Sequence, residues 1–351
     1  MKKIMLFSIF LATNSWASHN SHSNASDITG LVDLYQMVEK RIHSVFDDLD
    51  EGECLDMLQA LEGEGPYAKT ITEFSENSRA ELQEIVIARL ANFRPIEDRY
   101  LKQTVLLNFG QFVDDLAELS SATLKRFRKL MWYNTRLPHG MYNYAFTDRL
   151  VQEDDLNSLV RDFGSTNTPF YFCTGFVETT EASRELLERA GLVSFGNLDG
   201  LCFQLVNELP QVNAPDSCDI RVVQTATEYQ QFATVMAEAA DIDSDIGIKF
   251  FNDFRTYQES KFLAIVAYLE DRSVGCSMLL NSANGVAGNY FDWVVPNHRR
   301  KGIGSAMTVK RLQLAKDSGK QFLVAQCMGT SSGLYQALGF KKVCEMGLYA
   351  K

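Results

Sequence analysis

The stretch "VVPNHRRKGIGSAM", residues 294–307, decides the fold of this chain. An apolar run ends at Pro296, basic residues follow, and two glycines lead into a helical pattern. Successive N–H groups of a glycine turn form a concavity for an anion, and the helix adds free N–H groups and the positive end of its dipole. Gly302 and Gly304 let the backbone approach such an anion without a Cβ in between. The order strand, basic glycine turn, helix therefore predicts a phosphate-binding loop.

The segments after this loop alternate between strand and helix patterns. The pattern predicts a helix over 299–319, a strand over 321–327, a short helix over 331–340 and a last strand over 341–350. Upstream, residues 219–242 read as a strand and then a helix, and residues 261–296 as three strands separated by turns. The C-terminal part is therefore predicted to be an α/β domain.

A weak internal repeat indicates a second copy of this fold earlier in the chain. Residues 186–203 and residues 334–350 share one pattern, a helix that ends at Gly191 or Gly339 and is followed by a strand. The earlier copy has no R-x-x-G-x-G between residues 138 and 169, and Leu187 stands where Tyr335 stands later. Residues 111–135 of that copy look helical, while residues 103–109 fit either a strand or a helix start.

The basic glycine loop and the later segment "LYQALGF" together resemble the GNAT superfamily of N-acetyltransferases. The residues that match the two family motifs are Val294, Pro296, Arg299, Gly302, Ile303 and Gly304, then Leu334, Tyr335, Gly339 and Phe340. The resemblance covers residues 219–351 and implies a GNAT fold there, a mixed, mostly antiparallel, splayed sheet flanked by helices. A degenerate GNAT-like α/β domain and a helical N-terminal region are expected to precede it.

The resemblance also implies a reaction. Acetyl-CoA is expected as cosubstrate in the gap between two splayed strands, with the backbone of residues 293–295 along the pantetheine arm. A β-bulge in the first of these strands would aim an N–H at the thioester carbonyl. Tyr335 matches the residue that protonates the departing thiolate. Asp292 has two open interpretations, a base that acts through a water and a carboxylate merely exposed at the end of a strand.

The residues expected to bind the cosubstrate lie on this strand and in the loop. They are Trp293, Val294, Val295, Arg299, Arg300, Lys301, Gly302, Ile303, Gly304 and Ser305. One position departs from the family pattern, because many members carry Asn seven residues before the tyrosine and this chain carries Met328. The departure affects the expected positioning of the cosubstrate rather than the fold.

The chain is divided by composition into four predicted segments. Residues 1–26 form a signal-like segment and linker, with two lysines, a short apolar run and small residues up to Ala17. The apolar run is too short to span a membrane. Residues 27–100 read as helices, residues 101–212 as the degenerate copy, and residues 219–351 as the catalytic GNAT domain. The segment between the two copies, residues 207–217, has two prolines and reads as a linker.

Charge and cysteine usage narrow the partners and the compartment. The net charge of −11 disfavours nucleic-acid binding. The seven cysteines are scattered, and neither they nor the histidines show the spacing of a metal site, so we expect buried thiols and no metal. Because acetyl-CoA is a cytosolic metabolite, the expected working site is the cytosol of the producing cell, or of a host after export. We expect no stable membrane insertion, and the sequence leaves the oligomeric state open.

The function predicted from the sequence is an N-acetyltransferase that transfers an acetyl or other acyl group from acetyl-CoA to a primary amine by direct attack. The acceptor is expected to be a small molecule or a peptide. The alternative is a catalytically inactive protein that uses the GNAT fold to bind acyl-CoA or a partner. A further alternative assigns the main function to the helical N-terminal region, as a partner-binding module.

Overall fold

A computed structural model of the chain describes residues 49–63, 76–94, 96–177, 180–215, 217–282 and 285–351. The signal-like segment, its linker and most of the first predicted helix lie outside the described residues. The chain divides into two compact units, residues 1–96 and residues 97–351.

The first unit is helical where it is described. Helices α3 (Glu51–Leu61) and α5 (Glu76–Leu90) contact each other. The start of α3 is fixed by a capping box, in which the Asp50 side chain accepts from the Glu53 backbone and the Glu53 side chain accepts from the Asp50 backbone. Arg89 at the end of α5 donates from Nε to the Leu49 carbonyl at 2.9 Å. The described segments of this unit thus match the predicted helical character.

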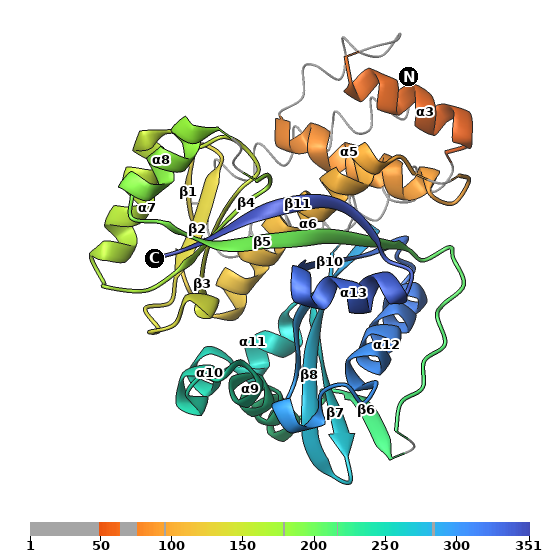
Figure 1. Ribbon diagram of the computed structural model, residues 1–351. Helices are drawn as coiled ribbons and strands as arrows, with labels where there is room; N and C mark the ends of the chain where they lie inside the picture. The colour runs from red at the N-terminus through yellow and green to blue at the C-terminus, as the bar shows by residue number, and fades with distance from the viewer. Residues whose placement is uncertain (1–48, 64–75, 95, 178–179, 216, 283–284) are drawn as a thin grey trace, which may run out of the picture. The chain divides into compact units, whose positions relative to one another are not determined.

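The second unit is built on one eleven-stranded sheet (Figure 1). It opens with helix α6 (Asp98–Leu119). A first series follows, namely β1 (Lys125–Phe127), β2 (Leu130–Asn134), β3 (Asn143–Thr147), α7 (Glu153–Gly164), β4 (Tyr171–Thr174), α8 (Glu181–Arg189) and β5 (Val193–Gln204). Next come β6 (Cys218–Val222), α9 (Ala226–Ala240), α10 (Ser244–Phe250) and α11 (Phe254–Glu259). A second series closes the chain, namely β7 (Phe262–Leu269), β8 (Arg272–Asn281), β9 (Val286–Val294), α12 (Ile303–Asp317), β10 (Phe322–Met328), α13 (Gly329–Ala337) and β11 (Lys341–Ala350).

The two series have the same topology, which confirms the tandem arrangement expected from the repeat. In each, three antiparallel strands lead into a helix, and the strand after that helix pairs parallel with the third strand. A second helix and a final strand follow in both copies. The two copies also differ, because the second is preceded by β6 and helices α9 to α11, whereas the first is preceded by the long helix α6 alone.

The final strands of the two copies are exchanged. The strand order is β4-β11-β5-β10, so β5 of the first copy pairs with β10 of the second copy, and β11 of the second pairs with β4 of the first. Between them β5 and β11 pair antiparallel over nearly their whole length, as the two long central strands of Figure 1 show. The exchange joins the two halves into one continuous sheet.

The exchange also mixes the two hydrophobic cores. Leu201 and Phe203 of β5 are buried in the cluster that contains Leu312 of α12 and Tyr335 of α13. Tyr349 of β11 is buried in the cluster of the first copy. Because apolar burial is the main stabilising contribution in folding, each copy depends on the other for part of its core.

One predicted element is wrong. Residues 111–135 do not form a single helix, because α6 ends at Leu119 and β1 and β2 follow it. Ser121 has a left-handed φ of 55°, which breaks the helix there. Beyond it, most of β2 lies in the core, since Leu130, Trp132 and Tyr133 are buried and Met131 is half-buried. Residues 103–109, open between strand and helix, belong to α6.

Candidate functional site

The site lies where β9 and β10 diverge. Their parallel pairing runs from Val286 opposite Phe322 to Asn289 opposite Ala325, and in the described sheet it continues no further. Beyond this point β9 stays paired with β8, while β10 stays paired with β5 of the first copy. The two strands therefore separate because each follows a different neighbour, which produces the splay predicted from the sequence.

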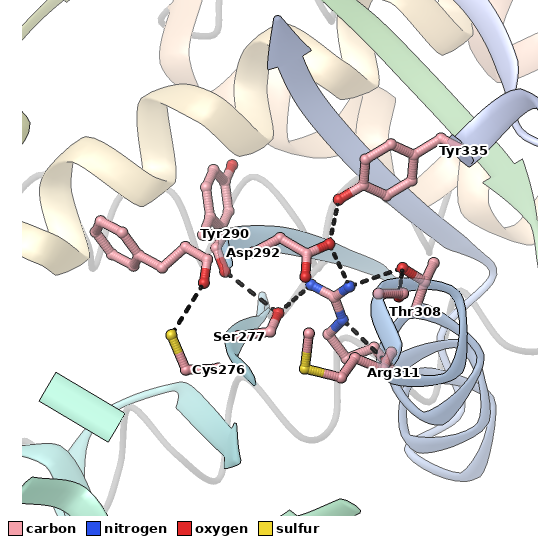
Figure 2. A network of polar contacts seen from close by, with 10 residues as sticks. Cys276, Ser277, Tyr290, Asp292, Thr308, Arg311 and Tyr335 are labelled. Carbon is pink, nitrogen blue, oxygen red and sulfur yellow. Dashed lines mark hydrogen bonds and ion pairs between the residues drawn. The ribbon is translucent and has the colours of Figure 1, made fainter. Parts of the chain in front are cut away.

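A β-bulge occurs in β9 at the splay, as expected. Cys276 of β8 pairs with Trp293 and Met278 pairs with Tyr290, so one extra residue is inserted in β9. Phe291 has a left-handed φ of 50°, which is uncommon for a bulky residue. The bulge turns the Asp292 side chain toward helices α12 and α13 (Figure 2).

Asp292 and Tyr335, the two predicted catalytic residues, are in direct contact. The Tyr335 hydroxyl on α13 donates to Asp292 Oδ2 at 2.6 Å (Figure 2). Tyr335 is only 4% exposed, and burial together with the neighbouring Asp292 charge holds its pKa well above the ordinary value. Its hydroxyl therefore stays protonated and is available as a donor. Asp292 is about one-fifth exposed and bonded on its inner side, so it is more than a carboxylate at the end of a strand.

A third member of this contact was not predicted. Arg311 of α12 donates from Nη2 to the same Asp292 Oδ2 at 2.7 Å, and its side chain is fully buried. Burial opposes the Arg311 charge, but the Asp292 carboxylate outweighs it and the pKa of Arg311 is raised. The sequence contains a signal for the burial of Arg311. Buried residues of α12 recur every four positions, and Arg311 belongs to this series with Ile303, Met307 and Ala315.

The glycine loop adopts the conformation that its residues predict. Arg300 and Gly302 have left-handed φ values of 63° and 84°, and α12 begins at Ile303. No side chain among the described residues caps this helix end, so its first-turn N–H groups are left for another acceptor. The first turn also contains no acidic residue. An anion would thus meet free N–H groups and the positive end of the helix dipole.

The basic side chains of the loop behave differently from one another. Arg299 donates from Nε to the Val294 carbonyl at 2.8 Å and from Nη2 to the Ala239 carbonyl at 2.9 Å. Its guanidinium thus fastens the loop to the end of β9 and to α9. Arg300 and Lys301 are exposed.

The remaining predicted cosubstrate residues flank the loop. Trp293 and Val294 close β9 and are half-buried, while Val295 is buried and its N–H is bonded to the Val274 carbonyl. Gly304 lies against α13, because a Cβ placed on it would stand 3.3 Å from Leu334. Ser305 is half-buried in the first turn of α12.

The departure at Met328 has a structural counterpart. Met328 ends β10 and precedes α13, and its Cε would lie 3.3 Å from a Cβ placed on Gly196 of β5. The methionine therefore packs toward the exchanged strand of the first copy. Next to it, burial raises the pKa of the Cys327 thiol to about 12, and this cysteine, like the other six, is free.

In the first copy, the helix start that corresponds to the glycine loop is acidic rather than basic. Helix α7 stands where α12 stands, but its first turn contains Glu153, Asp154 and Asp155. Three carboxylates at this end repel an anion. Leu187 occupies the position of Tyr335, third from the end of its helix, and is buried in the core of the first copy.

Within the described ranges, no group of three or more His, Cys, Asp or Glu side chains is placed to hold a metal ion. None of the helices described is both long and apolar enough to cross a membrane.

A family model matches the part of the chain that contains this site. Residues 260–342 match the model of the acetyltransferase (GNAT) domain. The fold and the splayed site thus define a GNAT domain in the C-terminal copy of a tandem arrangement, which supports a general function in acyl transfer. The sequence matches no curated protein.

Solved structures align with this chain at low sequence identity, and the first of them has a TM-score above 0.5. A GCN5-related N-acetyltransferase from Kribbella flavida aligns with a TM-score of 0.53 and 15% identity, over 71% of this chain and 95% of that one. A functionally unknown conserved protein from Staphylococcus epidermidis has a TM-score of 0.49 and 14% identity, over 66% and 94%. A tandem GNAT protein from the clavulanic acid biosynthesis pathway has a TM-score of 0.43 and 11% identity, over 79% and 95%.

Proposed function

We propose that the protein is an N-acetyltransferase that transfers an acetyl group from acetyl-CoA to a primary amine by direct attack. The observation that carries this proposal is the contact between Tyr335 and Asp292 at the splay of β9 and β10, beside the uncapped glycine turn of α12. A proton donor, a proton acceptor and an anion-binding turn within one site are the groups that this reaction requires.

The loop residues fit the pyrophosphate of acyl-CoA. The turn at Gly302 needs a left-handed backbone, and the first-turn N–H groups of α12 are uncapped by any described side chain. Arg300, Lys301 and Ser305 lie beside these N–H groups and would add charge and a hydroxyl. Arg299 would act indirectly, because its guanidinium is already bonded to backbone carbonyls. The end of the bulged strand, residues 293–295, would present its backbone to the pantetheine arm.

The chemistry follows from the placement of the two side chains. The amine nitrogen attacks the thioester carbonyl carbon, an N–C bond forms and the C–S bond breaks. Tyr335 holds a proton that the departing thiolate can accept, since burial and Asp292 keep its phenol protonated. Asp292 is the proposed acceptor of the amine proton, directly or through a water. Holding both reactants in one site supplies much of the rate by removing their freedom of motion.

We further propose one active site per chain, in the segment 219–351, with the segment 101–212 as a degenerate partner. The acidic first turn of α7 and the apolar Leu187 support this assignment. The proposed role of the first copy is structural, because β5 supplies part of the core beneath α12 and α13. The segments 1–26 and 27–100 are proposed as leader and helical accessory region.

The proposed acceptor is a small-molecule or peptide amine, and the proposed working site is the cytosol, where acetyl-CoA is present. Burial supports reduced cysteines, because it raises the pKa values of Cys327 to about 12 and of Cys344 to about 11, and such thiols react slowly. Sequencing the N-terminus of the native protein from each cell fraction tests the site of action.

The alternative, an inactive acyl-CoA-binding protein, is favoured by one observation, the apolar Met328 packed toward β5 at the end of β10. Mixing the protein with acetyl-CoA and a panel of amino acids, polyamines, aminoglycosides and peptides separates the two. Thiol release that depends on an amine supports the enzyme. Calorimetric binding of CoA with no thiol release in the whole panel supports the inactive binder.

A further inference from the structure

The Arg311 side chain is completely enclosed between α12 and the sheet. It donates from Nε to the Met307 carbonyl at 3.2 Å and from Nη2 to Thr308 Oγ1 at 2.9 Å and Asp292 Oδ2 at 2.7 Å. Its Nη1 donates to the Ser277 hydroxyl (Figure 2). Every nitrogen of the guanidinium therefore has an acceptor, and only one of these acceptors is charged.

Stability alone gives no reason for this arrangement. Taking a guanidinium and a carboxylate out of water is costly, and apolar residues of similar volume often replace a buried ion pair without loss of stability. Apart from Thr308, the buried positions of α12 near Arg311 are apolar, among them Ile303, Met307 and Leu312. A methionine at position 311 would extend that surface. Arg311 instead pairs with one particular atom, Asp292 Oδ2, which also accepts the hydrogen bond from the Tyr335 hydroxyl.

The shared oxygen links three groups from three elements. Arg311 approaches from α12, Tyr335 from α13, and Asp292 from the bulge of β9. Among the described residues, the other titratable groups that face Asp292 are two thiols, the buried Cys276 on β8 and the half-buried Cys327 on β10, and burial raises the pKa of both. Arg311 is therefore the cation that balances the negative charge at the centre of this group.

We propose that Arg311 is a positioning residue that makes Asp292 and Tyr335 a single proton-transfer pair. This inference rests on the proposed function. As the amine attacks and the C–S bond breaks, the amine proton passes to Asp292 and the Tyr335 proton passes to the thiolate. The proton on Asp292 then returns to the tyrosinate along their hydrogen bond, and both residues regain their starting states. The pair carries one negative charge throughout, and Arg311 stays beside it.

The first test measures the charge coupling without substrate. NMR of protein with ring-labelled tyrosine follows the titration of Tyr335, whose resonance is identified as the one missing in Tyr335→Phe. In Asp292→Asn the phenol loses the carboxylate and keeps the cation, so Tyr335 is expected to titrate at least one pH unit lower than in the wild type. In the double variant Asp292→Asn with Arg311→Met, the titration is expected to move back up. Equal titration in the single and double variants would overturn the proposal.

The second test uses turnover. Arg311→Met is expected to lower kcat at least tenfold with little change in the calorimetric Kd for CoA. The acid limb of the pH–kcat profile is expected to move to higher pH, because the negative charge of the Asp292–Tyr335 pair is no longer balanced by a cation. Arg311→Lys is expected to restore part of kcat and return the acid limb toward its place. An unshifted acid limb in folded Arg311→Met would contradict the proposal.

The two tests distinguish a failure of the proposed function from a failure of the proposed role of Arg311. If the wild-type protein releases no thiol with any amine, the proposed function is overturned, and the tyrosine titration still decides whether Arg311 acts on Tyr335. If Arg311→Met does not fold, circular dichroism shows it at once. The titration then decides, because it compares Asp292→Asn only with the double variant. That variant contains no unpaired buried charge.

Discussion

Replacing Tyr335 by Phe is the sharpest single perturbation of the proposed chemistry. The ring and its edge contact with Phe340, at 5.2 Å between centroids, are kept, and only the hydroxyl is lost. That hydroxyl donates to a charged oxygen at 2.6 Å. Hydrogen bonds to charged groups contribute about 1.5–3 kcal/mol to folding stability. Because Arg311 still pairs with Asp292 in the variant, we expect a loss near the lower end of this range, and the protein should remain folded.

The expected loss in turnover is larger than the loss in stability. General acid catalysis contributes roughly 10²-fold or more, which corresponds to about 2.7 kcal/mol in the barrier. The assay is thiol release at saturating acetyl-CoA and amine, with CoA affinity measured by calorimetry and stability by urea unfolding. Tyr257→Phe is the matched control, because Tyr257 is buried and its hydroxyl donates to the Val223 carbonyl away from the site. Turnover in Tyr335→Phe equal to that of the wild type would assign Tyr335 to core packing alone.

Four further predictions concern the glycine loop and the two copies. Gly304→Glu should abolish CoA binding in calorimetry, because it places a charged side chain at the pyrophosphate turn. The control variant Gly164→Glu, in the open space at the end of α7, should bind CoA normally. Unchanged CoA affinity in Gly304→Glu would contradict the assigned loop. Gly302→Ala should lower the free energy of unfolding in urea by about 1–3 kcal/mol, because the φ of Gly302 is 84° and the new Cβ would overlap the Asn213 carbonyl. An unchanged unfolding midpoint would refute this. At saturation the full chain should bind one CoA, and two sites would disprove a degenerate first copy. A fragment of residues 219–351 should fail to fold, because it lacks β5, and a cooperative melt would show otherwise.

The sequence was sufficient for the fold of the second copy because its signals are local. A basic glycine turn between an apolar strand and a helix has one favourable backbone path, and the positive φ at Gly302 confirms it. The bulge and the splay followed from the family resemblance, and both are present. The helix expected over residues 111–135 was wrong because the break at Ser121 carries no glycine or proline to mark it.

The strand exchange and the role of Arg311 could not be read from the sequence. Pairing of β5 with β10 depends on strands more than a hundred residues apart, and either copy's last strand fits either position by pattern alone. The four-residue spacing with Ile303, Met307 and Ala315 marks Arg311 as a buried position, but its partner is not visible in the sequence. Asp292, nineteen residues earlier, is brought to the same face only by the bulge.

The most direct test of the central claim is acetyl-CoA turnover with a panel of amines, monitored both by thiol release and by the mass of the acceptor. We expect that thiol release depends on an amine, that one acetyl group is added to that amine, and that both signals are lost in Gly304→Glu. Thiol release without acetylated amine, or CoA binding with no release across the whole panel, would contradict it.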